Sequence, residues 1–122
     1  MKKIALIILF QVVSLNAHSA LMKCQFGMAG APLGDVKLPF DENGQPGEYA
    51  DVSLFFAPVR KFPVTVVPSG TGESLRAYLA KEDPQNELLL IVKNPEGSLY
   101  KSILINASAP AGAKELQGSC TF

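Results

Sequence analysis

The chain has 122 residues, with eleven basic and eleven acidic side chains and therefore no formal net charge. A chain of this length fits one domain with one hydrophobic core. Its scattered charges lack the basic footprint that nucleic-acid binding requires and the polybasic run that binds anionic lipid, so we expect neither partner.

The first twenty residues have the order of a secretory signal peptide. Lys2 and Lys3 give a positive start, residues 4–13 form an apolar stretch too short to span a bilayer, and small residues follow up to Ala20. We predict cleavage after Ala20 or, alternatively, after Ser19. The protein would then be exported, periplasmic or secreted, without a membrane anchor. The alternative is an N-terminal core helix, in which the two lysines and the small residues have no purpose.

Residues 21–122 form the predicted single β domain and carry two cysteines, Cys24 and Cys120. In an exported chain an even cysteine count indicates a disulfide, and closing so long a loop stabilises by about 4–5 kcal/mol in the chain-entropy model. The competing interpretation is a pair of reactive or metal-binding thiols. Zinc would require further Cys or His ligands, and the one histidine of the chain, His18, leaves with the leader.

Alternating apolar and polar residues predict short strands throughout this domain. Residues 21–26 place Cys24 on the same face as two apolar side chains, and residues 116–122 place Cys120 on the apolar face of the last strand. Both cysteines therefore face inward, as a buried bridge requires. Further strands are expected at residues 35–40, 49–56, 64–67, 74–82, 87–94 and 98–106.

Three of these segments have features that bear on the architecture. Residues 87–94 contain an unbroken run of Leu, Ile and Val, which predicts an interior strand covered on both faces. Prolines on both sides of residues 64–67 indicate a short strand at the edge of a sheet. Residues 74–82 fit a strand, and the alternative there is a helix.

Seven or eight short strands separated by Gly- and Pro-containing turns predict an all-β fold. Our first choice is a small antiparallel β-sandwich, and the alternative is a small β-barrel. In either architecture the N- and C-terminal strands are joined by the disulfide. Neighbouring strands should be antiparallel, because their connections are short.

Residues 21–122 contain no histidine and no tryptophan. The commonest general base and metal ligand is therefore missing, together with every Ser-His or Cys-His nucleophile arrangement. The acidic pair Glu82 and Asp83 is better explained as a turn than as a glycosidase pair. We predict a non-enzymatic domain with no catalytic residue, no metal site and no cofactor.

Residues 55–63 concentrate three phenylalanines, two prolines and two cations near the predicted edge strand. Aromatic residues and Arg are favoured at the centres of protein interfaces, and an exposed edge accepts a partner strand. The alternative is that Phe56 and Phe62 belong to the core and that the two cations form an ordinary solvated loop tip. The candidate partner-binding residues are Phe55, Arg60, Lys61 and Phe62.

The expected function is an exported, non-enzymatic binding domain that recognises another protein through an edge strand or a loop surface. Two alternatives remain open: a carrier that holds a small apolar ligand in a barrel interior, and an inhibitor of a secreted or host hydrolase. A cavity of about 300 Å³ or more lined by Leu, Val and Phe would favour the carrier, whereas a filled core with an aromatic surface patch would favour the interaction domain.

Overall fold

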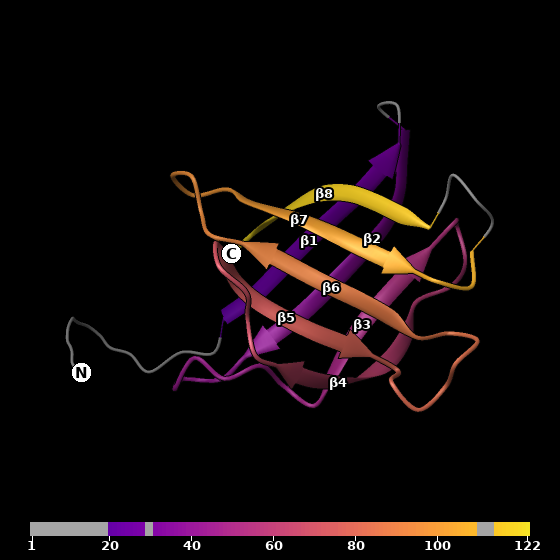
Figure 1. Cartoon of the computed structure of the whole chain (residues 1–122), viewed down its shortest axis with the longest axis horizontal. Helices are drawn as coiled ribbons and strands as arrows, with labels where there is room; N and C mark the ends of the chain where they lie inside the picture. The colour runs from indigo at the N-terminus through magenta and orange to yellow at the C-terminus, as the bar shows by residue number, and fades with distance from the viewer. Residues whose placement is uncertain (1–19, 29–30, 110–113) are drawn as a thin grey trace.

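A computed structural model describes residues 20–28, 31–109 and 114–122. These residues form eight antiparallel strands and no helix, and the strands follow one another around a closed barrel in which β8 returns to pair with β1 (Figure 1). The predicted leader lies outside the described residues except for Ala20, which begins the first strand. The strands are β1 (Ala20–Met28), β2 (Ala31–Phe40), β3 (Tyr49–Leu54), β4 (Arg60–Val67), β5 (Glu73–Leu79), β6 (Leu88–Lys93), β7 (Tyr100–Asn106) and β8 (Glu115–Thr121).

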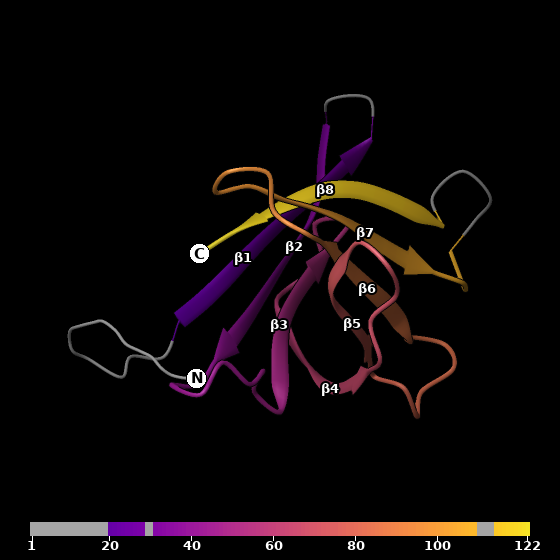
Figure 2. The same ribbon diagram turned by 60° about the vertical axis from the view of Figure 1, so that its left-hand side comes forward.

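The predicted all-β fold is confirmed, and of the two architectures the structure has the barrel rather than the sandwich. Each strand pairs with its neighbours in the sequence, and the first pairs with the last, so a single sheet curves onto itself (Figure 2). Full closure of this kind removes the edges of a sheet. The segment that fitted either a strand or a helix is a strand, β5.

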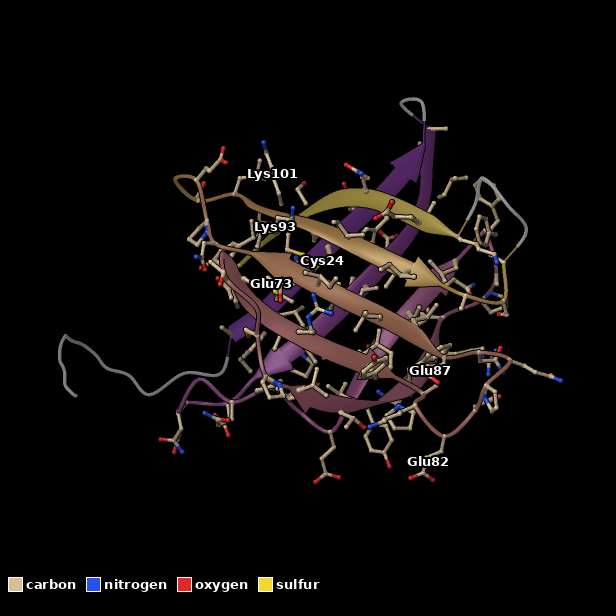
Figure 3. All side chains as sticks on the ribbon, viewed as in Figure 1. Cys24, Glu73, Glu82, Glu87, Lys93 and Lys101 are labelled. Carbon is tan, nitrogen blue, oxygen red and sulfur yellow. A yellow bond between two sulfur atoms is a disulfide. The ribbon has the colours of Figure 1, made fainter. Side chains whose placement is uncertain are left out.

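The β1–β8 seam closes the barrel and contains the predicted disulfide. Cys24 and Cys120 are directly opposite each other across the seam, with Cα atoms 4.0 Å apart, and their sulfur atoms are bonded (Figure 3). Two residues before Cys120, Gly118 lies against β1 so closely that a methyl group there would run into the carbonyl oxygen of Gln25. Glycine at this position therefore permits the close approach of the two terminal strands.

The barrel interior is filled by side chains from every strand. Alternate residues of each strand point inward, which is the two-residue period predicted from the sequence. The largest fully buried side chains are those of Phe26, Met22, Leu38, Leu79, Leu88, Leu90, Leu104, Leu116, Val36, Val92, Cys24 and Cys120.

Strand β6 corrects the expectation that its apolar run is covered on both faces. The run alternates between the packed core and the outer surface of the barrel, where Ile91 lies between Arg76 of β5 and Ile103 of β7. Ile91 is nevertheless buried. A closed barrel has one interior, so the outer face of this strand is covered by neighbouring side chains of the same sheet rather than by a second layer.

Residues 64–67 belong to a closed barrel rather than to the edge strand of an open sheet, although in the strand ladders they pair with β5 alone. Strand β4 is longer than predicted and changes partners halfway: residues 60–63 pair with β3, and residues 64–67 pair with β5. The change occurs at Pro63, whose carbonyl oxygen accepts a hydrogen bond from the amide of Ala80 at 2.8 Å. Proline has no N–H to donate, and at this junction its absence costs no ladder hydrogen bond.

Candidate functional site

The two open ends of the barrel differ in the chain segments that surround them. The terminal mouth, as we name it, contains the start of β1, the end of β8 and the connections β2–β3, β4–β5 and β6–β7 (Figure 1). The opposite mouth contains the end of β1, the start of β2, the connections β3–β4 and β5–β6, the end of β7 and the start of β8. All four candidate partner-binding residues lie at the opposite mouth, on β4 or on the connection that precedes it.

Three of these four residues, Phe55, Arg60 and Phe62, line one hollow at the opposite mouth. Phe62 is buried in the core, and the guanidinium carbon of Arg60 lies 5.2 Å from the centre of its ring, so Arg60 covers Phe62 from the mouth. Phe55 reaches the same hollow from the β3–β4 connection. Lys61 points to the outer wall, where its Nζ lies 3.2 Å from Oδ1 of Asp51 on the neighbouring strand. That pair is exposed and contributes little to stability.

Residues 54–57 form a tight turn, which we call the phenylalanine turn. Its two central residues have positive φ angles, 53° at Phe55 and 66° at Phe56, and the amide of Ala57 donates a hydrogen bond of 3.0 Å to the carbonyl oxygen of Leu54. A turn with two positive φ angles is of type I′, which strongly prefers Asn and Gly. A residue other than glycine costs about 1–3 kcal/mol at each such position.

The surrounding structure holds the phenylalanine turn in this conformation. The amide of Phe55 donates a 2.7 Å hydrogen bond to the carbonyl oxygen of Leu33 on β2, and Oγ of Ser53 donates one of 2.7 Å to the carbonyl oxygen of Ala57. Both phenylalanines remain accessible, with 42% of Phe55 and 88% of Phe56 exposed. The turn is therefore a fixed projection that presents aromatic rings to solvent.

Sequence reasoning did not select Phe56, the most exposed large apolar residue described. Its alternation with Val52 and Leu54 predicted a strand through residue 56 and placed Phe56 on the inner face or in the core. The strand ends at Leu54 instead, and the chain turns before the next inward position. The positive φ angles that end the strand leave no signal in a Phe-Phe pair, because type I′ turns are recognised by Asn and Gly.

The opposite mouth itself contains a small hollow with a polar rim. Its volume is about 180 Å³, and its floor is made by Phe62 and Leu88. Arg60 supplies a positive charge at the rim, and amide side chains surround the rest. These polar lining residues are Arg60, Gln85, Asn86 and Asn106.

The terminal mouth contains a larger hollow of about 360 Å³, whose described lining residues carry no charged side chain. The ring of Phe122 meets the rings of Phe40 and Tyr100 edge to face, with 5.5 Å between ring centres in both pairs. Met22, Leu75 and Val92 are buried beneath them. The hollow is open to solvent and does not continue into the barrel. Its remaining lining residues are Gly44, Gln45, Pro46, Val66, Ser69, Ser74 and Pro95.

The carboxylate with the strongest perturbation, Glu73, supports the turn beside the terminal mouth. Hydrogen bonds from the guanidinium of Arg76, at 2.8 and 3.0 Å, and from the amide of Gly70, at 2.8 Å, lower the pKa of Glu73 to about 2. The same bonds raise the pKa of Arg76. A carboxyl group with this pKa is ionised at neutral pH and does not serve as a proton donor there. Through these hydrogen bonds Glu73, which is labelled in Figure 3, holds the β4–β5 turn in place.

Within the described ranges no three His, Cys, Asp or Glu side chains gather in a way that would hold a metal ion. Over the same ranges, no helix has the length and apolarity of a membrane span. In comparisons with known proteins, no family model, no curated protein and no solved structure matches this chain.

Proposed function

We propose that this chain is an exported, non-enzymatic binding domain that recognises another protein through the phenylalanine turn. One observation carries the proposal. Phe55 and Phe56 occupy the strained central positions of a type I′ turn, and Phe56 is 88% exposed. Strain that the fold maintains at an exposed position is a mark of functional sites.

Folding alone gives no reason for phenylalanine at these two positions. The other positive φ angles of the described residues fall on Gly44, Gly72 and Gly97, where the conformation is free of strain, and on Ala80. Asn and Gly would form the phenylalanine turn at lower cost. Exposed aromatic rings also have an unfavourable contact with water. A partner that buries the rings removes the cost of exposing them, and the hydrophobic effect then favours the complex and offsets the backbone strain.

The geometry of the turn suits protein recognition. A ring held on a fixed backbone loses little conformational entropy on binding, which favours affinity. Large aromatic side chains that enter a pocket are typical hot spots of interfaces. Val59 is exposed in the same connection, and Arg60 and Lys61 follow it. We expect a partner with an apolar pocket for Phe56.

The closed barrel narrows the predicted modes of binding to the loop surface, because every described strand has a neighbour on both sides. Export is supported by the predicted leader and by the disulfide, since such bonds persist in oxidising compartments. Buried side chains occupy the described middle of the barrel, so a ligand of the carrier kind would lie at a mouth rather than along the barrel axis.

A photo-crosslinking residue in place of Phe56 tests the proposal in the cell that exports the protein. The matched control carries the same residue in place of Thr65, an exposed position on the outer wall of β4. We expect one discrete protein adduct from position 56 and none from position 65. Excess wild-type protein should suppress the adduct, whereas excess Phe56→Ala protein should not.

Equal labelling from both positions would contradict the proposal, as would competition by Phe56→Ala. Since most of the Phe56 ring is exposed, Phe56→Ala should melt at nearly the wild-type temperature, and this separates lost binding from lost folding. Flotation with vesicles of phosphatidylglycerol tests a lipid surface as the alternative. Phe56-dependent flotation without a protein adduct would replace the proposed protein partner with a membrane.

A further inference from the structure

We infer that the terminal mouth is a second binding site, which takes a free, small, uncharged apolar molecule against the rings of Phe40, Tyr100 and Phe122. This site is independent of the proposed function, since it lies at the other end of the barrel. Mouths of β-barrels are common places for small-molecule sites.

Inward-facing apolar residues stay exposed at this mouth. Phe40, Val66, Tyr100 and Phe122 are inward positions of β2, β4, β7 and the end of β8, as the alternation of buried residues along those segments shows. Inward apolar positions in the middle of the barrel are buried, but Val66 remains 50% exposed and Phe122 60% exposed. Apolar side chains that converge on one hollow without being covered are features of ligand-binding grooves.

The shape of the hollow limits the size of the ligand. Its volume of about 360 Å³ lies at the lower end of the range for small-molecule sites, which is about 300–1,000 Å³. Met22, Leu75 and Val92 close it from below and are themselves packed in the core. A ligand therefore occupies the mouth alone, and a compact molecule such as a fused-ring aromatic fits better than a long acyl chain.

The lining determines the charge of the ligand. None of the described residues that line this hollow has a charged side chain. A charge buried there would be unpaired and strongly disfavoured. Gln45, Ser69 and Ser74 offer neutral polar groups at the rim, which can orient a hydroxyl, ether or carbonyl of the ligand. The opposite mouth, by contrast, has Arg60 in its lining.

Titration of the exported protein with N-phenyl-1-naphthylamine, an uncharged probe that fluoresces in apolar surroundings, tests the site. The test variant is Val66→Glu, which puts a charge at an inward and half-exposed position. Its matched control is Thr65→Glu, which adds the same charge to the outer wall. We expect saturable binding at one site, and a Kd about tenfold or more weaker in Val66→Glu, because the charge must be desolvated beside the probe. Thr65→Glu and Phe56→Ala should bind as wild type does.

Four results would overturn the inference. The first is a fluorescence increase that does not saturate, and the second is equal binding by Val66→Glu and wild type. The third is a wild-type dimer that Val66→Glu converts to a monomer in light scattering, which would mean that a second copy covers the mouth. Loss of binding in Phe56→Ala would place the probe at the phenylalanine turn and would also overturn it.

Discussion

The two mouths of the barrel are built from equivalent positions and differ in the charged and amide side chains that they carry. At the opposite mouth the last inward positions of β4 and β7 are Arg60 and Asn106, whereas at the terminal mouth they are Val66 and Tyr100. Folding requires apolar residues in the middle layers of a barrel but leaves its ends free to differ. The residues at the two ends of the barrel therefore carry information about binding, whereas the residues in its middle reflect the requirements of folding.

The mouths also expose aromatic rings in different ways. At the opposite mouth the exposure depends on a strained turn between two strands. At the terminal mouth the rings of Phe40 and Phe122 lie at or just beyond the ends of strands, and neither residue has a positive φ angle. Relieving the strain of the phenylalanine turn should thus stabilise the protein and remove partner binding at the opposite mouth. It should leave the terminal mouth unchanged.

The largest expected effect comes from removing the disulfide, in the double variant Cys24→Ser/Cys120→Ser. The bridge spans 96 positions, so its loss should lower the free energy of unfolding by about 4–5 kcal/mol in urea titrations. Cys120 lies opposite Tyr100 and two residues before Phe122, so the terminal mouth should lose its probe binding before the rest of the barrel unfolds. Wild-type protein in reductant is the control. A loss below about 1 kcal/mol would show that strand pairing alone closes the seam.

Replacing Phe55 and Phe56 with Asn and Gly should have the next largest effect, of opposite sign. The new residues suit the type I′ turn, so the free energy of unfolding should rise by about 1–2 kcal/mol, net of the lost contacts of the partly buried Phe55 ring. The crosslinking partner should be lost at the same time. The single variant Phe56→Ala keeps a Cβ at positive φ, so it should lose the partner without the gain in stability. If the double variant Phe55→Asn/Phe56→Gly is less stable than wild type, the turn is not strained.

The variant Ser102→Ala should give a smaller increase in the free energy of unfolding. Ser102 is an inward residue of β7 between Val92 and Gly118, it is 2% exposed, and its hydroxyl has no hydrogen-bond partner among the described residues. Removing an unsatisfied buried hydroxyl should raise the free energy of unfolding by about 1 kcal/mol. Thermal unfolding of Ser102→Ala against the outward-facing Ser119→Ala would measure it, and a loss of stability would mean that the hydroxyl is satisfied.

Local patterns were sufficient to predict the strands and the bridge. Alternation placed Cys24 and Cys120 on the inward faces of the terminal strands, and both are buried there and bonded. These features depend on residues near one another in sequence, for which side-chain period and turn chemistry are sufficient evidence.

Closure of the barrel and the exposed rings of the site depend on contacts that the sequence pattern does not contain. Apolar and polar residues alternate in the same way in a sandwich and in a barrel. The barrel is distinguished by the pairing of β1 with β8, where Gly118 permits their close approach. The aliphatic residues on the outer face of β6 predicted a second layer of structure over the sheet. The sequence pattern is the same whether a second layer or the side chains of neighbouring strands cover such residues. Phe40, Tyr100 and Phe122 are brought together from distant segments, so no local signal groups them.

The smallest expected effect is a pH dependence at the terminal mouth, due to Glu73. Its folded-state pKa of about 2 lies below the ordinary value of 4.5, so the unfolded chain binds the proton more readily than the folded one. The stabilisation is therefore complete above pH 4.5 and is lost as the pH falls toward 2. The stability difference between wild type and Glu73→Gln, from urea titrations across this range, should shrink with falling pH. In an NMR titration, Arg76→Met should move the Glu73 midpoint up toward its ordinary value, because the largest cause of the shift is gone. A midpoint that stays near 2 in Arg76→Met would assign the shift to the Gly70 amide instead.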